Sequence, residues 1–285
     1  MSKTICFFSI FILGFIIYYF FDVFYFKNIQ QFSKEIFYSK AIAHMIAYTI
    51  TLIPLVITLK VLFPTKSILS LLSLDKSITK GFILAFLGTS PMLIGYGLYF
   101  KINTALNIES LFINTISSAF FEEIIFRAFL IGTLYRFTRL GFLSSLLFGS
   151  LVFAQVHLYQ SQNSMELIEI FTITFLGSVF FAWIYIEQGF NLWSAIFPHF
   201  FMNLYWEIFT VSENVAGNLY GNLYKLLSIF LIIAFIVYHK RKKKYLFRLR
   251  GECFFLKAQK FNHKFCIILQ YVDRKFSERK NKKCH

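Results

Sequence analysis

The sequence predicts an all-α, polytopic membrane protein with about eight transmembrane helices. Of its 285 residues, 57% are hydrophobic, 21% are aromatic and only 15% are charged, and the mean hydropathy is +0.62. A soluble globular domain has about a quarter of its residues charged, so this chain needs lipid around much of its surface. The apolar runs are too long for barrel strands, and a helix satisfies its own backbone hydrogen bonds in lipid.

Eight apolar runs approach the roughly 20 residues that a helix needs to cross about 30 Å of hydrocarbon. Polar turn signals separate them: residues 64–80 are rich in Ser and Lys, residues 103–110 are polar, and residues 213–222 contain Asn and Gly. The first run has no small-residue cleavage site after it, so we expect it to be retained as an anchor. The expected spans are residues 5–21, 41–63, 81–100, 111–135, 141–157, 167–187, 191–210 and 226–238.

The excess positive charge lies almost entirely at the C-terminal end. Residues 239–285 contain 16 Lys and Arg against 3 Asp and Glu, a net charge of +13, which leaves +2 of the total +15 for residues 1–238. We therefore expect a membrane domain over residues 1–238 and a basic tail over residues 239–285. The positive-inside rule predicts a cytoplasmic C-terminus, and eight spans then place the N-terminus on the same side.

The basic tail is expected to bind anionic lipid headgroups, which attract each nearby cationic side chain by about 1 kcal/mol. Two segments of the tail, residues 253–256 and 261–271, mix apolar and basic side chains and favour an amphipathic surface helix. The tail contains no nucleic-acid-binding motif, so we expect lipid rather than nucleic acid as its partner.

Ionisable residues inside the fourth expected span point to function, because each costs about 2.5–3.5 kcal/mol to insert. Glu123 and Arg127 are four positions apart, so they stack on one helix face and can neutralise each other. Glu122 lies about 100° around the helix from Glu123. We therefore expect Glu122 to project toward another helix, free for chemistry.

Polar residues also occur in the fifth and seventh spans. His157 ends the fifth span, one turn after Phe153, whose ring could restrict the imidazole. His199 and Asn203 are four positions apart and point the same way, and Glu207 continues this stripe. Glu207 either extends the site or faces a lipid headgroup.

A carboxylate with two imidazoles and an amide is sufficient for hydrolysing an amide bond, because it supplies a base for water and donors for the oxyanion. The alternative is a divalent metal such as zinc, held by Glu122, His157 and His199. Spacing does not choose between the two, although the HExxH helix of many zinc proteases is absent. The four Cys form no CxxC pair, so no thiolate zinc site is predicted.

Three motifs follow one another along the chain: EExxxR at Glu122, Glu123 and Arg127, FxxxH at Phe153 and His157, and HxxxN at His199 and Asn203. Together they resemble the signature of the CPBP family of intramembrane proteases, which includes the type II CAAX prenyl endopeptidases and the bacterial Abi proteins. The resemblance covers residues 111–206, and Ala128 stands where the family often has Gly.

The resemblance implies a role for each motif residue. Glu122 would activate water and His157 would help to position it. His199 and Asn203 would stabilise the oxyanion. Glu123 and Arg127 would hold the helix geometry. The family has been described both as zinc-dependent and as using a metal-free glutamate mechanism, and the residues of this chain suit either account.

The function expected from this resemblance is that of an intramembrane endopeptidase cutting a CAAX-like or bacteriocin-type peptide near the membrane surface. The expected location is a bacterial plasma membrane. The competing hypothesis is a non-catalytic membrane carrier, or a bacteriocin-immunity or anchoring protein, that uses the same buried polar cluster for binding.

Overall fold

The structure, a computed structural model, describes residues 3–212 and 214–242. All named elements in this part of the chain are helices. One isolated antiparallel β-bridge joins Ile102 and Phe209. Six helices are long and apolar enough to cross a membrane. The prediction of an all-α polytopic membrane protein is therefore confirmed. The predicted tail segments at residues 253–256 and 261–271 lie outside the described residues.

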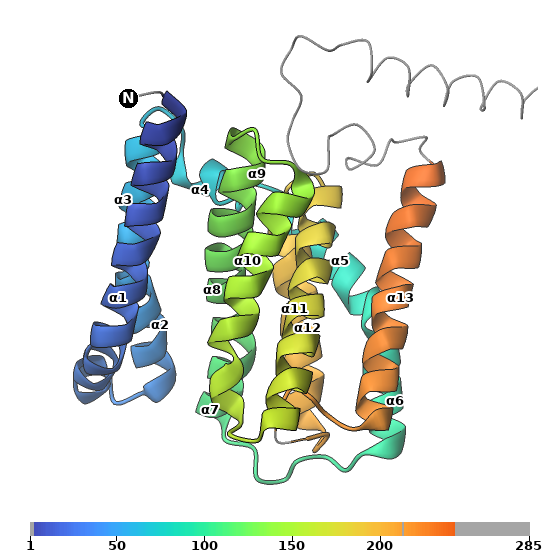
Figure 1. The fold of residues 1–285 in the computed structure, drawn as a ribbon. Helices are drawn as coiled ribbons and strands as arrows, with labels where there is room; N and C mark the ends of the chain where they lie inside the picture. The colour runs from blue at the N-terminus through green and yellow to red at the C-terminus, as the bar shows by residue number, and fades with distance from the viewer. Residues whose placement is uncertain (1–2, 213, 243–285) are drawn as a thin grey trace, which may run out of the picture.

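The helices run roughly parallel or antiparallel in one bundle (Figure 1). In chain order they are α1 (Lys3–Phe37), α2 (Lys40–Thr51), α3 (Ile53–Leu62), α4 (Ile68–Leu71), α5 (Ile78–Gly88), α6 (Ser90–Tyr99), α7 (Ile108–Phe112), the π-helix η1 (Ile113–Ser117), α8 (Ser118–Glu122), the π-helix η2 (Glu123–Gly132), α9 (Thr133–Phe137), α10 (Phe142–Val156), the 3-10 helix η3 (Leu158–Gln160), α11 (Ser164–Glu187), α12 (Trp193–Ile208) and α13 (Leu219–Lys242).

Two of the expected spans are each divided into a pair of helices without a loop. Pro54 lies in the first turn of α3 and Pro91 in the first turn of α6. Proline has no backbone N–H, so the helical hydrogen bond to the preceding turn is missing at each site. The helical hydrogen-bond pattern is therefore interrupted between α2 and α3 and between α5 and α6, although each pair together is long and apolar enough to cross a membrane.

The FxxxH motif lies in α10, one of the six apolar helices, and the other two motifs lie in the two expected spans outside the six. One is the continuous helical run from α7 to α9, which contains Glu122, Glu123 and Arg127, and the other is α12, which has 16 residues. Their site residues lower the local hydropathy, and α12 is shorter than a full span. The total of eight spans stays a prediction.

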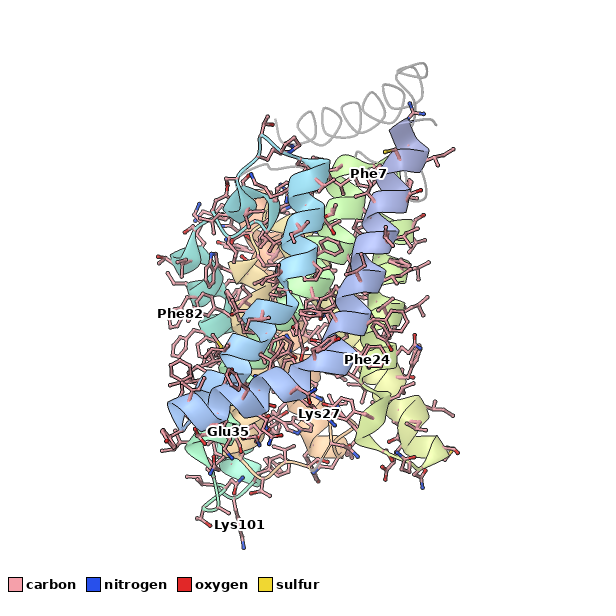
Figure 2. The ribbon with its side chains drawn as sticks, turned by 90° about the vertical axis from the view of Figure 1, so that its left-hand side faces the viewer. Phe7, Phe24, Lys27, Glu35, Phe82 and Lys101 are labelled. Atoms are coloured by element: carbon pink, nitrogen blue, oxygen red, sulfur yellow. The ribbon has the colours of Figure 1, made fainter. Side chains whose placement is uncertain are left out.

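The first helix continues well beyond the apolar run that predicted it. The run ends near residue 21, but α1 extends to Phe37 because no Gly or Pro interrupts it after Gly14. Tyr38, with φ of +53°, ends the helix, and the Ser39 hydroxyl caps α2. Figure 2 shows the last part of α1, from Phe24 to Glu35, bending across the end of the bundle.

The α1–α3 hairpin packs beside the α7–α9 run through aromatic rings. Phe11 stacks on Phe129 with 4.9 Å between ring centroids, and Tyr48 stacks on Phe121 at 4.7 Å. The N-terminal end of α1 and the C-terminal end of α13 lie at the same end of the bundle (Figure 1).

One lysine of the basic block at the end of α13 turns inward. Lys240 is buried and pairs with the buried Glu187 of α11, whereas Arg241 and Lys242 are exposed. Only part of the block is therefore available to lipid headgroups.

A glycine allows α5 to approach the start of α12. A Cβ atom at Gly81 would lie 2.6 Å from the backbone carbonyl carbon and oxygen of Trp193. Backbone atoms cannot move aside as the end of a flexible side chain can. Gly81 therefore lets α5 pack closely on the start of α12, the helix that carries His199 and Asn203.

Gly81→Ala is expected to lower the thermal unfolding temperature in detergent, because overpacking of this kind costs about 1–3 kcal/mol. The matched control is Gly177→Ala in α11, where nothing lies within 4 Å of the added Cβ. The control should leave stability unchanged or raise it by about 0.5–1 kcal/mol through helix propensity. Equal unfolding temperatures for the two variants would contradict the close packing of α5 on α12.

Candidate active site

Glu122 ends α8 between two π-helical stretches, η1 and η2. Such wider turns are often found at functional sites, where they rotate side chains out of the regular α-helical register. Glu123 begins η2, and its carboxylate lies 3.0 Å from the guanidinium of Arg127, with both side chains fully buried. The two neighbouring glutamates therefore have different surroundings.

Arg127 lies against the faces of two phenylalanine rings. Its guanidinium carbon is 4.3 Å from the ring centroid of Phe153 on α10 and 5.4 Å from that of Phe181 on α11. Cation–π attraction of this kind strengthens when water is excluded. The buried cation is therefore stabilised by the Glu123 carboxylate and by two rings from neighbouring helices.

His199 is oriented by the same buried pair. Its Nδ1 lies 2.8 Å from Glu123 Oε1, and its ring stacks on Phe181 at 5.1 Å with an interplanar angle of 14°. An ionised carboxylate can only accept, so Nδ1 carries the proton. The other nitrogen, Nε2, faces Glu122 Oε2 at 3.9 Å.

His157 is oriented by its own helix. Its Nδ1 lies 2.7 Å from the backbone oxygen of Phe153, and its ring packs on the Phe153 ring at 4.3 Å. A carbonyl oxygen can only accept, so here too Nδ1 carries the proton. Nε2 faces Glu122 Oε2 at 3.8 Å.

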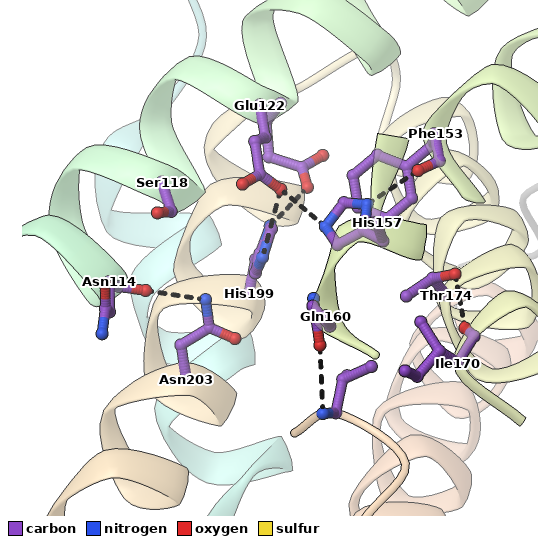
Figure 3. A network of polar contacts seen from close by, with 12 residues as sticks. Asn114, Ser118, Glu122, Phe153, His157, Gln160, Ile170, Thr174, His199 and Asn203 are labelled. Carbon is purple, nitrogen blue, oxygen red and sulfur yellow. Dashed lines mark hydrogen bonds and ion pairs between the residues drawn. The ribbon is translucent and has the colours of Figure 1, made fainter. Parts of the chain in front are cut away.

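The imidazoles of His157 and His199 therefore converge on one oxygen of the Glu122 carboxylate (Figure 3). The Glu122 side chain is 18% exposed and the His157 side chain 16%, but Glu122 Oε2 itself is buried and has no hydrogen-bond partner among the described residues. Separations of 3.8 and 3.9 Å are too long for direct hydrogen bonds and suit a small bridging group such as water.

Asn203 lies one turn after His199 and faces η1. Its Nδ2 donates to the backbone oxygen of Asn114 at 3.0 Å, and the amide of Asn114 donates to Glu207 Oε1 at 3.1 Å. A primary amide has two N–H donors, so one donor of Asn203 is left for a ligand. Glu207 thus meets the α7–α9 run through Asn114.

The alternative zinc ligands Glu122, His157 and His199 lie together but are spaced more widely than the ligands of a bound zinc ion. Zinc ligand atoms lie about 2.0–2.2 Å from the metal, which places two of them ~3.4 Å apart at a tetrahedral angle. The Glu122 oxygen is 3.8 Å from His157 Nε2 and 3.9 Å from His199 Nε2. Within residues 3–212 and 214–242, no three His, Cys, Asp or Glu side chains form a group that could hold a metal ion.

Several side chains near the site carry no signal in the sequence. Phe181 contacts both Arg127 and His199, but in a chain with 40 Phe no pattern distinguishes it. Tyr48, from the N-terminal hairpin, stacks on Phe121, the residue before Glu122. This contact depends on how the hairpin docks, which local spacing does not reveal.

Comparison with known proteins supports the family assignment. Residues 104–205 match the family model described as "Type II CAAX prenyl endopeptidase Rce1-like". Searches of curated proteins and of solved structures gave no match. The matched segment contains all three sequence motifs. Residues 104–205 are therefore similar to the Rce1-like type II CAAX prenyl endopeptidases, in agreement with the resemblance of the motifs to the CPBP family.

Proposed function

We propose that this protein is an intramembrane endopeptidase in which Glu122 activates a water molecule to hydrolyse a peptide bond near the membrane surface. The observation that carries the proposal is the convergence of His157 Nε2 and His199 Nε2 on Glu122 Oε2, at 3.8 and 3.9 Å. The Rce1-like segment points to a protease and agrees with this chemistry.

His157 and Glu122 orient the water. With its proton on Nδ1, the neutral His157 imidazole has a lone pair on Nε2, so it accepts one hydrogen bond from water. Glu122 Oε2 accepts the other. The water oxygen then directs a lone pair at the substrate carbonyl carbon. As the C–O bond forms, Glu122 takes the proton.

His199 and Asn203 stabilise the oxyanion that this step creates. This role requires a proton on Nε2 as well as on Nδ1 of His199, and the Glu123 carboxylate at 2.8 Å balances the resulting imidazolium charge. The spare N–H of Asn203 supplies the second donor. Donors placed in advance at the oxyanion are worth about 10²–10³ in rate each.

The reaction ends when the tetrahedral intermediate collapses. The C–N bond breaks, its electron pair stays on the nitrogen, and Glu122 returns its proton to that nitrogen. One peptide leaves with a new carboxyl terminus and the other with a new amine. Glu122 is again ionised and can bind the next water.

The proposed substrate is a CAAX-like or bacteriocin-type peptide, and the proposed setting is a bacterial plasma membrane with the C-terminus in the cytoplasm. The support is the Rce1-like segment, together with the exposed Arg241 and Lys242 at the end of α13. Both described ends of the chain lie at one end of the bundle, which agrees with a shared side for the termini.

Glu122→Gln is expected to lower peptide hydrolysis at least about 100-fold, because an amide cannot take the proton from water. The matched control is Glu169→Gln, an exposed glutamate of α11 outside the site. Hydrolysis by purified protein in detergent should persist in the control. Both variants should keep the unfolding temperature of the wild type.

Zinc analysis of the wild type, Glu122→Gln and His199→Ala proteins separates the glutamate-activated water from a zinc-dependent mechanism. Loss of cleavage in Glu122→Gln and His199→Ala without any change in zinc supports the glutamate-activated water. Loss that follows depletion of stoichiometric zinc makes these residues metal ligands. Full cleavage by Glu122→Gln would contradict the proposal and favour the carrier, immunity or anchoring role.

Phe181→Leu is expected to lower kcat about tenfold, because the His199 ring loses the surface that holds it against Glu123. Phe180→Leu is the control, since Phe180 is equally buried at 8% exposure. Both variants remove a similar volume and should lose similar stability in thermal unfolding. Equal kcat values for the two variants would show that the Phe181–His199 stack does not position the imidazole.

A further inference from the structure

A row of polar side chains leads from the site to the end of α12. We call Asn103, Asn114, Asn203 and Glu207 the polar track. Asn203 donates to the Asn114 backbone oxygen, Asn114 donates to Glu207 Oε1, and the Asn103 amide lies 3.4 Å from the Glu207 backbone oxygen. These contacts join η1, α12 and the loop before α7 beside Glu122.

The polar track can be reached from outside the protein. Asn114 is exposed, and both Asn203 and Glu207 are partly exposed. Amide side chains have donors and acceptors, which an extended peptide needs for its backbone groups where water is scarce. The track therefore has the chemistry to hold a peptide on its way to Glu122.

The hydrogen-bond partner of the Glu207 carboxylate is a neutral amide. The Glu207 side chain accepts a hydrogen bond from neutral Asn114, and no Lys, Arg or His among residues 3–212 and 214–242 forms an ion pair with it. Lys101, in the loop that pairs with Thr210, is exposed. A partly buried carboxylate without a cationic partner can form a charge-assisted hydrogen bond when a cation binds beside it, so we expect the ligand to supply that cation.

We propose that Glu207 is a specificity-determining residue that binds a positively charged side chain of the substrate peptide. The proposal rests on the function proposed above and names its substrate class, which is peptides with Lys or Arg close to the cleaved bond. Glu207 lies four residues, or about 6 Å of helix rise, beyond Asn203. An extended peptide advances about 3.3 Å per residue, so the cation lies about two residues from the cleaved bond.

The test compares peptides that carry Lys, norleucine or Glu at each of the three positions on either side of the cleaved bond. The wild type is expected to prefer Lys over Glu at least about tenfold in kcat/KM at one of these positions, which corresponds to about 1.4 kcal/mol. Glu207→Gln should remove this preference, and Glu207→Lys should reverse it. The control Glu169→Lys should keep the ranking of the wild type. An unchanged ranking in Glu207→Lys would overturn the proposal.

A binding measurement separates this proposal from the proposed function. Fluorescence anisotropy reports the affinity of the same peptides for Glu122→Gln protein, with and without Glu207→Lys, in nanodiscs of phosphatidylglycerol. A Lys preference that Glu207→Lys reverses supports the role of Glu207 even if the wild type cleaves no peptide. Equal affinities for Lys and Glu peptides overturn that role even if cleavage occurs. Loss of the Lys preference when phosphatidylethanolamine is added would assign Glu207 to a lipid headgroup and also overturn it.

Discussion

The buried ion pair between Glu123 and Arg127 is the interaction on which the rest of the site depends. Both side chains are fully buried, and removing one partner of such a pair typically costs about 3–5 kcal/mol because the other charge is left unpaired. Glu123 also orients His199, and Arg127 lies against Phe153 and Phe181. One pair of charges thereby links η2 to α10, α11 and α12.

This linkage explains how two imidazoles come to face a single carboxylate oxygen. Each histidine uses Nδ1 for a fixed acceptor, which is Glu123 for His199 and the Phe153 backbone for His157. Each ring also packs on a phenylalanine that contacts Arg127. The Nε2 atoms are then held toward Glu122, and the aromatic rings around them lower the local dielectric and strengthen every charge interaction.

The apolar surface and the polar site are built from different helices. Six helices are long and apolar enough to cross a membrane, whereas the α7–α9 run and α12 carry most of the polar residues of the site and pack among other helices. Within α12, the polar residues lie along one stripe. His199 faces Glu122, Asn203 donates to the Asn114 backbone oxygen, and Glu207, near the end of the helix, accepts a hydrogen bond from the Asn114 side chain. The stripe thus connects the proposed reaction centre with the proposed region of substrate selection.

Much of the architecture could be predicted because lipid imposes simple rules on sequence. Apolar runs had to become helices, and the i, i+4 spacing of Glu123 with Arg127 and of His199 with Asn203 already placed each pair on one face. Helix ends were less predictable. α1 continues to Phe37 because no Gly or Pro interrupts it after Gly14. Pro54 and Pro91 each divide an expected span into two helices.

By itself the sequence determined the helical class, the three motifs and the difference between Glu122 and its neighbour, because these follow from composition and from spacing along one helix. Only the tertiary structure decided which groups meet across helices. Phe181 on His199, Asn114 between Asn203 and Glu207, and Lys240 turned toward Glu187 are contacts between segments distant in sequence. Helix packing sets such contacts, and it depends on the shape of whole faces rather than on any local pattern.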